Sequence, residues 1–242
     1  MNPVRNNNIN NTVLKRYANS LMVSRISNGV KFYLNTNHPL ALDSYEYRYP
    51  MPKKHVKYNS RNINFNARLP KSASVLDLGC GGGGFIKDCT DEGRLAVGLE
   101  GTDRYRKAGW AEWATIPEYL FTCDITKSFI LHLGDEKPYQ FDVITAWEVM
   151  EHIPKSRLNQ LLKNITNHLK TNGVFIASIS NKTSINPKYN IDMHRIHKDL
   201  DWWLGKFNKA NLIRDKKKES HFDNQWIRNE RKSYHLVLRK KN

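Results

Sequence analysis

The segment VLDLGCGGGGF, residues 75–85, joins a short apolar run to a run of glycines that leads into a helical pattern. Glycine adopts positive φ readily and lets a ligand approach the backbone closely. In parallel sheets, nucleotide-like ligands bind at the tip of the strand that precedes such a loop. No Gly-Lys-Ser/Thr follows, which excludes a phosphate-cradling loop. Asp77 beside the glycines would repel a pyrophosphate, but it suits a cationic amino-acid group.

The chain around this segment alternates between strand and helix patterns. We expect strands at residues 74–80, 94–100, 119–125, 139–147, 174–180 and 233–241. We expect helices after the glycines and at residues 103–114, 155–173 and 199–213, with Gly173 ending the helix that begins at residue 155. Strands that alternate with helices predict an α/β domain with a mainly parallel sheet.

The N-terminal part of the 242 residues has a different character. We expect residues 1–65 to form a flexible tail and a helical or irregular lid, and residues 66–242 to form one domain. The Asn-rich start predicts a mobile tail, and the apolar spacing over residues 13–26 predicts an amphipathic helix. The stretch YEYRYPMPKKHVKY, residues 45–58, fits a lid or a substrate-facing arm, and equally aromatic packing against the domain edge.

Composition narrows the class of protein. The net charge of +16 favours polyanionic or phosphorylated partners, although the scattered positions also fit a solvated basic surface. Cys80, Cys89 and Cys123 are odd in number and lack CxxC spacing, which is typical of reduced thiols. No apolar run reaches the roughly 20 residues of a membrane span, and the first residues lack the apolar region of a secretory signal. We therefore expect a cytoplasmic protein.

Two more acidic residues stand at the ends of predicted strands. Glu100 closes the second strand, where an acid can accept hydrogen bonds from both hydroxyls of a ribose. Asp124 lies at the end of the third strand, where it could accept a hydrogen bond from an adenine amino group. With Asp77, these acids predict a pocket for an adenosine joined to an ammonium-bearing tail.

Four segments, VLDLGCGGGG, GLEG, CDIT and FDVITAWEVMEHI, resemble in this order the motifs of class I S-adenosylmethionine-dependent methyltransferases. The resemblance covers residues 75–179. It implies a Rossmann-like seven-stranded sheet with helices on both faces, an antiparallel last strand at residues 233–241, and S-adenosylmethionine as cofactor. The cofactor-binding residues that it implies are Asp77, Gly79, Cys80, Gly81, Glu100, Gly101, Asp124, Ile125, Ala146 and Trp147.

The segment WEVMEH, residues 147–152, brings together two carboxylates and an imidazole. If the chain becomes helical after the fourth strand, Glu148, Glu151 and His152 share one face of the helix. Such a face can hold a divalent metal, move protons or cap a helix. The expected Asn/Asp-Pro-Pro-aromatic tetrapeptide of many N-methyltransferases is replaced here by AWEV, which disfavours N-methylation of adenine or an amide.

The Glu-x-x-Glu-His pattern resembles two groups of O-methyltransferases, those of the ubiquinone pathway and those that act on the terminal 2′-hydroxyl of small RNAs. In the latter a further histidine beyond the fifth strand completes a metal site. The resemblance implies Mg²⁺ or Mn²⁺ bound by Glu148, Glu151 and His152 with His194 or His197. Other relatives with this pattern bind no metal, and in them the histidine and glutamate cap the helix and contact substrate. Without metal, His152 or His194 of this chain would serve as a general base. The catalytic residues expected are Glu148, His152 and His194.

The acceptor is predicted from a further resemblance. EVMEHI followed by a later histidine and Trp202-Trp203 resembles methyltransferases encoded beside glycosyltransferases, which implies O-methylation of a sugar hydroxyl in a glycan or glycan precursor. The paired indoles also fit packing between helix and sheet. A 2′-O RNA methyltransferase is the alternative that the net charge favours. A catalytically silent cofactor-binding protein is the third alternative, and it predicts damaged motifs.

Overall fold

The computed structural model describes residues 22–25, 31–44, 65–222 and 233–241. Its central sheet has seven strands in the order β11-β12-β8-β7-β3-β4-β5. The strands are β3 (Val75–Leu78), β4 (Ala96–Glu100), β5 (Leu120–Thr122), β7 (Phe141–Trp147), β8 (Leu169–Ser180), β11 (Leu212–Arg214) and β12 (Ser233–Lys240). β12 is antiparallel to both of its neighbours, while β3, β4, β5, β7 and β8 pair in parallel. The predicted α/β sheet with an antiparallel last strand is confirmed.

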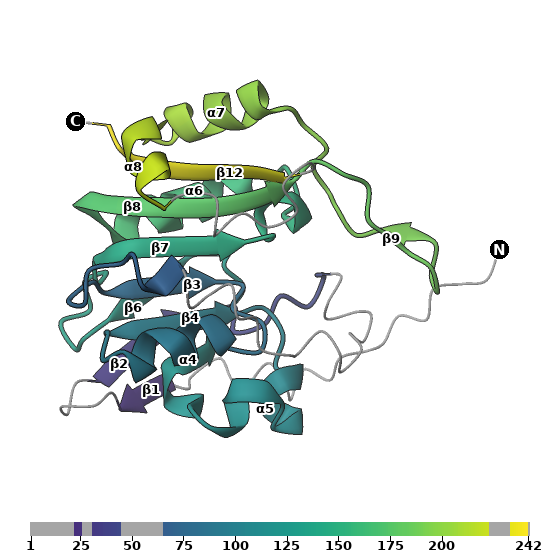
Figure 1. Cartoon of the computed structure of the whole chain (residues 1–242). Coiled ribbons are helices and arrows are strands. Elements are labelled where there is room, and N and C mark those ends of the chain that lie inside the picture. The colour runs from purple at the N-terminus through teal and green to yellow at the C-terminus, as the bar shows by residue number, and fades with distance from the viewer. Residues whose placement is uncertain (1–21, 26–30, 45–64, 223–232, 242) are drawn as a thin grey trace.

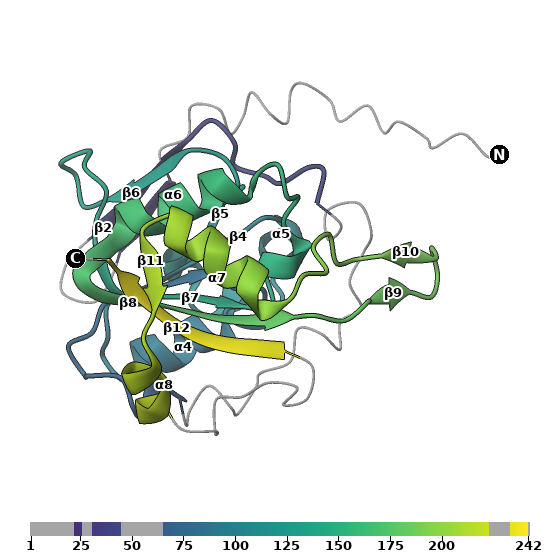
Figure 2. The ribbon, with the colours of Figure 1, turned by 90° about the horizontal axis from the view of Figure 1, so that it is seen from above.

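Helices cover both faces of this sheet. The α-helices are α4 (Gly84–Asp91), α5 (Arg104–Ala108), α6 (Leu158–His168), α7 (Leu200–Lys209) and α8 (Lys216–Phe222). α4 lies against one face, and α6 and α7 lie against the other (Figures 1 and 2). Because both faces are covered, every residue of β3, β4 and β5 is buried, as is usual for parallel strands.

Three predicted helices end earlier than the sequence pattern indicates. The helix expected over residues 199–213 ends at Lys209, and Leu212 already belongs to β11, which pairs with β12. The helix expected over residues 103–114 breaks at Gly109, which is left-handed at φ 58°, and a separate 3-10 turn η2 (Ala111–Ala114) follows. The helix expected over residues 155–173 ends at His168, because Leu169 already pairs with Phe141 in the sheet. Gly173 therefore lies inside β8. A Cβ there would come within 2.9 Å of the carbonyl oxygen of Asp142.

The N-terminal segment contributes strands rather than the predicted helix. Residues 22–25 form β1 (Met22–Arg25), so the helix expected over residues 13–26 is wrong for that part, and its other residues lie outside the described ones. β2 (Lys31–Thr36) joins β1 and β6 (Phe129–His132) in a small antiparallel sheet that the sequence analysis missed. The tyrosine-rich residues 45–58 also lie outside the described residues.

Residues 31–44 contact the edge of the main sheet. Phe32 and Leu34 are buried in the same core as β3 and β4. Ala41 N–H donates to the carbonyl oxygen of Gly101, and the carbonyl oxygen of His38 accepts from Asp124 N–H, both bonds being 2.8–2.9 Å long. This segment is thereby fixed beside the carboxyl ends of β4 and β5.

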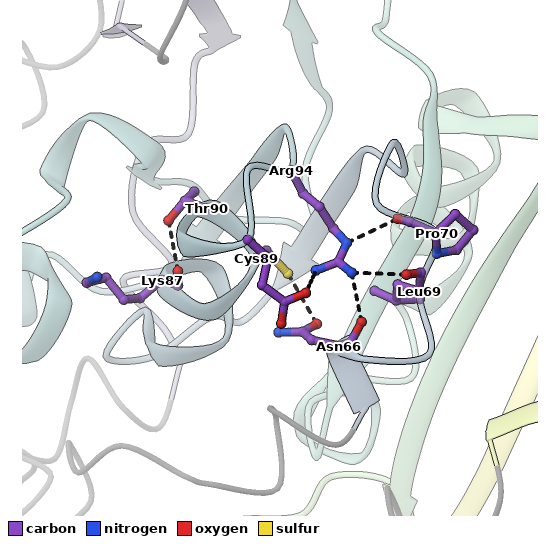
Figure 3. A network of polar contacts seen from close by, with 8 residues as sticks. Asn66, Leu69, Pro70, Lys87, Cys89, Thr90 and Arg94 are labelled. Carbon is purple, nitrogen blue, oxygen red and sulfur yellow. Dashed lines mark hydrogen bonds and ion pairs between the residues drawn. The ribbon is translucent and has the colours of Figure 1, made fainter.

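A buried arginine fixes the start of the domain (Figure 3). The Arg94 guanidinium donates to the backbone carbonyls of Asn66, Leu69 and Pro70 at 2.8–3.1 Å and pairs with Glu92 at 2.7 Å. The planar fork of arginine can serve several acceptors at once, which an ammonium group cannot do in the same geometry. The turn before β3 is therefore held against the loop between α4 and β4.

His168, at the end of α6, is a buried imidazole whose tautomer is fixed. Its Nδ1 lies 2.9 Å from the carbonyl oxygen of Asn164 and must donate, while Nε2 accepts from Leu131 N–H at 3.1 Å. The ring stacks on Phe129 with centroids 4.8 Å apart. Burial lowers the pKa of His168 to about 4. A protonated Nε2 could no longer accept the hydrogen bond from Leu131 N–H. The folded protein therefore keeps the imidazole of His168 neutral.

The depressed pKa makes stability fall on acidification. Below the unfolded pKa of 6.5 the unfolded chain binds a proton that the folded chain does not, so stability is lost as the pH falls from 6.5 towards 4. Between pH 7.5 and 5 this amounts to about 2 kcal/mol of unfolding free energy. Denaturant titrations at both pH values should show that His168→Gln removes this part of the loss. The control variant His38→Gln, at an exposed histidine, should lose as much stability between the two pH values as wild type does. Equal losses in wild type and His168→Gln would contradict the assignment.

Candidate functional site

A pocket of about 180 Å³ lies at the carboxyl ends of β3, β4, β5 and β7. It is lined by Ala41, Ser44, Gly79, Gly81, Glu100, Gly101, Cys123, Asp124, Ile125, Thr126, Trp147, Glu148, Val149, His152 and Ile153. The carboxyl edge of a parallel sheet is the usual position of ligand sites in open α/β folds. Seven of the ten residues expected to bind a cofactor line this pocket, and Asp77, Cys80 and Ala146 do not.

The glycine loop forms one wall of the pocket. Gly79, Gly81 and Gly83 all have positive φ, at 72°, 53° and 86°. A Cβ at Gly79 would lie 2.5 Å from Val149 Cγ2, so no side chain fits there. Trp113, on η2, donates from its indole nitrogen to the carbonyl oxygen of Gly81 at 2.8 Å and supports the loop from outside.

The three acidic residues at the strand ends are each held by hydrogen bonds. Glu100 Oε2 accepts from Gly81 N–H at 2.8 Å, and Oε1 accepts from Thr102 N–H at 3.2 Å. Asp124 Oδ1 accepts from the backbone and hydroxyl of Thr126. Asp77 accepts from the Thr145 hydroxyl at 2.7 Å and lies behind the loop. The pocket therefore has two fixed carboxylates, Glu100 and Asp124, on its lining.

At one side of the pocket, the Glu-x-x-Glu-His segment does not form the expected helical face. Glu148 is left-handed at φ 55°, and only η4 (Met150–His152) makes a single 3-10 turn. The backbone N–H of Glu148 donates to the carbonyl and the hydroxyl oxygens of Ser178 on β8, which holds this conformation. A non-glycine residue in this region is strained, and such strain concentrates at functional sites.

Three side chains meet at one point. Glu151, His152 and His194 each offer a possible ligand atom, and these atoms lie within 4.8 Å of one another. His152 Nδ1 lies 3.0 Å from the carbonyl oxygen of Met193, and His194 Nδ1 lies at hydrogen-bond distance from that of Lys182. Because a carbonyl can only accept, both Nδ1 atoms carry the proton and both Nε2 atoms are acceptors. Metal-binding histidines commonly have this arrangement.

Electrostatics keep both imidazoles neutral. Burial, with a smaller contribution from His194, lowers the pKa of His152 to about 4. Burial also lowers the pKa of His194. At neutral pH each ring therefore has an unprotonated Nε2, which can bind a cation or take up a proton.

The two carboxylates in this region lack partners for one oxygen each. Glu151 is fully buried, and its Oε1 accepts from Ser180 N–H at 2.9 Å. Glu151 Oε2 and Glu148 Oε1 are buried with no hydrogen-bond partner among the described residues. Burial, together with the charge of Glu148, raises the pKa of Glu151 to about 8. A divalent cation at the cluster would satisfy Glu151 Oε2, and a donor set of one carboxylate and two imidazole nitrogens fits Mg²⁺ or Mn²⁺. Glu148, which was expected in this set, is not among the three residues whose possible ligand atoms lie together.

His197 and the paired tryptophans lie apart from this cluster. His197 Nε2 pairs with Asp192 Oδ2 at 2.7 Å, and its ring centroid is 6.1 Å from that of His194. The structure thus places His194, rather than His197, beside Glu151 and His152. Trp203 is buried and stacks on Phe207, while Trp202 is half-buried between two lysine ammonium groups. For Trp203 the packing interpretation holds.

Residues that the sequence analysis missed complete the site. Ala41 and Ser44 line the pocket from the N-terminal segment, and Val149 fills the space beneath Gly79. No motif marks them, because their role depends on contacts between distant parts of the chain. The serines of β8 that hold Glu148 and Glu151 were also missed, although their position at the end of a predicted strand was a usable signal.

A seven-stranded sheet with this strand order, and a glycine-walled pocket with acids at its strand ends, define a class I methyltransferase fold. The chain belongs to the methyltransferase domain family, which matches its residues 47–227. The TehB-like SAM-dependent methyltransferase of Corynebacterium glutamicum has the same fold, with a TM-score of 0.51 and 16% identity over 75% of this chain and 87% of that one.

Two curated relatives share part of the chain. The ubiquinone biosynthesis O-methyltransferase of Nitrosospira multiformis is 32% identical over 92 residues, which are 38% of this chain and 37% of the relative. The protein of the same name from Rickettsia prowazekii is 27% identical over 130 residues, 53% of this chain and 48% of the relative. The chain thus spans less than half the length of either. Among the helices in the described residues, none is long and apolar enough to cross a membrane.

Proposed function

We propose that this protein is an S-adenosylmethionine-dependent O-methyltransferase that acts, with a divalent cation, on a sugar hydroxyl of a glycan or glycan precursor. One observation carries the proposal. His152 lines the pocket and also belongs to the three-residue cluster, so the cofactor site and the cluster share a wall. A methyl donor and an acceptor hydroxyl have to meet at such a boundary.

The chain's residues fit the cofactor in a definite way. Glu100 ends β4 on the lining of the pocket, and two backbone N–H groups hold its carboxylate there, where it would accept both ribose hydroxyls. Asp124 and Ile125 would bind the adenine, while the glycine loop would adjoin the amino-acid end. Asp77, behind the loop, would attract the ammonium group of the cofactor's amino-acid end. S-adenosylmethionine supplies an activated methyl group when it is bound.

The acceptor side depends on the cluster. Glu148, Glu151, His152 and His194 would hold Mg²⁺ or Mn²⁺, which when bound lowers the pKa of an acceptor hydroxyl and orients it. Without a bound cation, the free Nε2 of either neutral imidazole could instead take up the hydroxyl proton. Val149 and Ile153 add apolar side chains to the lining of the pocket, which would limit the access of water to it.

The choice of a sugar rests on the resemblance of EVMEHI and the later histidine to glycan-modifying methyltransferases. Vicinal hydroxyls of a sugar suit two-point binding at a cation. A second candidate is a phenolic hydroxyl, which the names of the two curated relatives favour. An RNA terminal ribose is a third candidate, favoured by the net charge of +16.

The full chain, incubated with isotopically labelled S-adenosylmethionine and Mn²⁺, tests these acceptors side by side. We expect mass spectrometry to detect methylated deoxyhexose or pentose glycosides, and little product from a catechol or from short RNA. Matched deoxy-glycosides that lack one of two neighbouring hydroxyls should be poor acceptors. Transfer to the catechol alone would replace the sugar by a phenol, and transfer to RNA alone, weakened by salt, would replace it by a ribose terminus.

A further inference from the structure

Resting on the proposed cation site, we infer that Asp192 is a positioning residue: it fixes the base of a surface hairpin so that His152 and His194 are aligned toward one cation. The hairpin consists of β9 (Ile185–Asn186) and β10 (Ile191–Asp192). It projects from the body of the molecule at the carboxyl edge of the main sheet (Figures 1 and 2).

The Asp192 carboxylate joins three parts of this region. Its Oδ1 accepts from the backbone N–H of Ser184 at 3.1 Å and of His194 at 3.0 Å. Its Oδ2 pairs with His197 Nε2 at 2.7 Å. One side chain therefore joins the segment between β8 and β9, the residues just after β10, and the loop that continues to α7.

The hairpin base in turn holds both imidazoles of the cluster. The backbone carbonyl oxygen of Lys182, before β9, accepts from His194 Nδ1. The backbone carbonyl oxygen of Met193, after β10, accepts from His152 Nδ1. Met193 N–H donates to the carbonyl oxygen of Ser184 at 2.9 Å, which ties the two sides together. Any change in the spacing of the two sides must rotate or release one of the rings.

The strands of the hairpin themselves contribute little to fixing this spacing. Its strands pair over two residues each, and an isolated hairpin of this length is at best marginally stable in water. Ile185 and Ile191 are exposed, at 49% and 36%, so the hairpin strands bury little apolar surface. The hydrogen bonds to the Asp192 carboxylate are charge-assisted and therefore stronger than the backbone pairs alone.

The test measures cation binding without turnover. Calorimetry with Mn²⁺ on chelator-stripped full-length protein should show an affinity about 10- to 100-fold weaker in Asp192→Ala than in wild type, the range typical of residues that orient metal ligands. Asp192→Asn keeps an oxygen acceptor for the two backbone N–H groups and should recover most of the loss. His197→Gln removes only the contact of Asp192 Oδ2 with the imidazole and should change the Mn²⁺ affinity little. Asp201→Ala, at an exposed position on α7, is the matched control.

A second measurement separates alignment from general destabilisation. In metal-free protein, ¹⁵N NMR of the imidazoles should show His152 and His194 protonated at Nδ1 in wild type and in Asp192→Asn, and tautomer exchange in Asp192→Ala. Binding of S-adenosylhomocysteine should be retained in all variants. Equal Mn²⁺ affinity and equal tautomers in Asp192→Ala would overturn this inference alone. No Mn²⁺ binding by wild type would instead overturn the proposed cation site, and the inference with it.

Discussion

Chelation of divalent cations should abolish methyl transfer, and Mn²⁺ or Mg²⁺ should restore it. The physical reason lies in two buried carboxylate oxygens, Glu148 Oε1 and Glu151 Oε2, which have no hydrogen-bond partner among the described residues. A cation that polarises an acceptor oxygen lowers the activation barrier by several kcal/mol, so we expect the rate to fall by about 1,000-fold when it is removed. Initial rates with and without chelator measure it directly.

Variants of the two glutamates locate the effect. Glu148→Ala and Glu151→Gln should each lose Mn²⁺ binding and turnover, whereas Glu136→Gln, in the exposed loop after β6, should keep both. Without metal at neutral pH, Glu151→Gln should unfold at the same temperature as wild type or higher, because it removes a buried carboxyl whose raised pKa of about 8 makes it costly to fold. Mn²⁺ should raise the unfolding temperature of wild type but not of this variant.

The opposite result has a clear meaning. If chelator-treated, metal-free protein keeps its full rate, the cation is not required. His152 or His194 would then act as a general base. Their depressed pKa values leave Nε2 unprotonated at neutral pH, which this role needs.

The sheet and its glycine loop could be predicted from sequence because their signals are local. Apolar runs, glycines and acids at strand ends recur at fixed spacing, and parallel topology then brings the strand ends to one edge. This is why the strand positions around Asp77, Glu100 and Asp124 are confirmed. The small sheet of β1, β2 and β6 could not be predicted in the same way, because β2 and β6 are far apart in the chain.

The local geometry of the cluster could not be predicted because tertiary contacts override the helical spacing. Glu148 is held left-handed by Ser178, and the carbonyl oxygen of Glu151 accepts from the backbone N–H groups of Arg195 and Ile196. A helical face shared by Glu148, Glu151 and His152 is incompatible with these bonds. Similarly, nothing in the spacing of His194 and His197 distinguishes them. The 2.7 Å contact of His197 Nε2 with Asp192 Oδ2 distinguishes the two histidines in the structure.

Glu100→Ala should weaken the binding of S-adenosylhomocysteine by about 100-fold or more, because hydrogen bonds to a charged group contribute about 1.5–3 kcal/mol each and the ribose would lose two. Calorimetry without acceptor measures this loss. Glu100→Gln keeps the shape of the side chain and one acceptor oxygen, so its affinity should fall between wild type and Glu100→Ala.

The Glu100 carboxylate also supports the glycine loop, so the experiment must separate this structural role from ribose binding. It binds Gly81 N–H and Thr102 N–H, so Glu100→Ala releases the glycine loop as well as the ribose. Adenine and methylthioadenosine can serve as probes, since only the second carries ribose hydroxyls. If the ribose is the ligand of Glu100, the alanine variant should lose affinity for methylthioadenosine but not for adenine. Equal losses for both probes would assign Glu100 to the support of the loop, and unchanged affinity would remove it from the cofactor site.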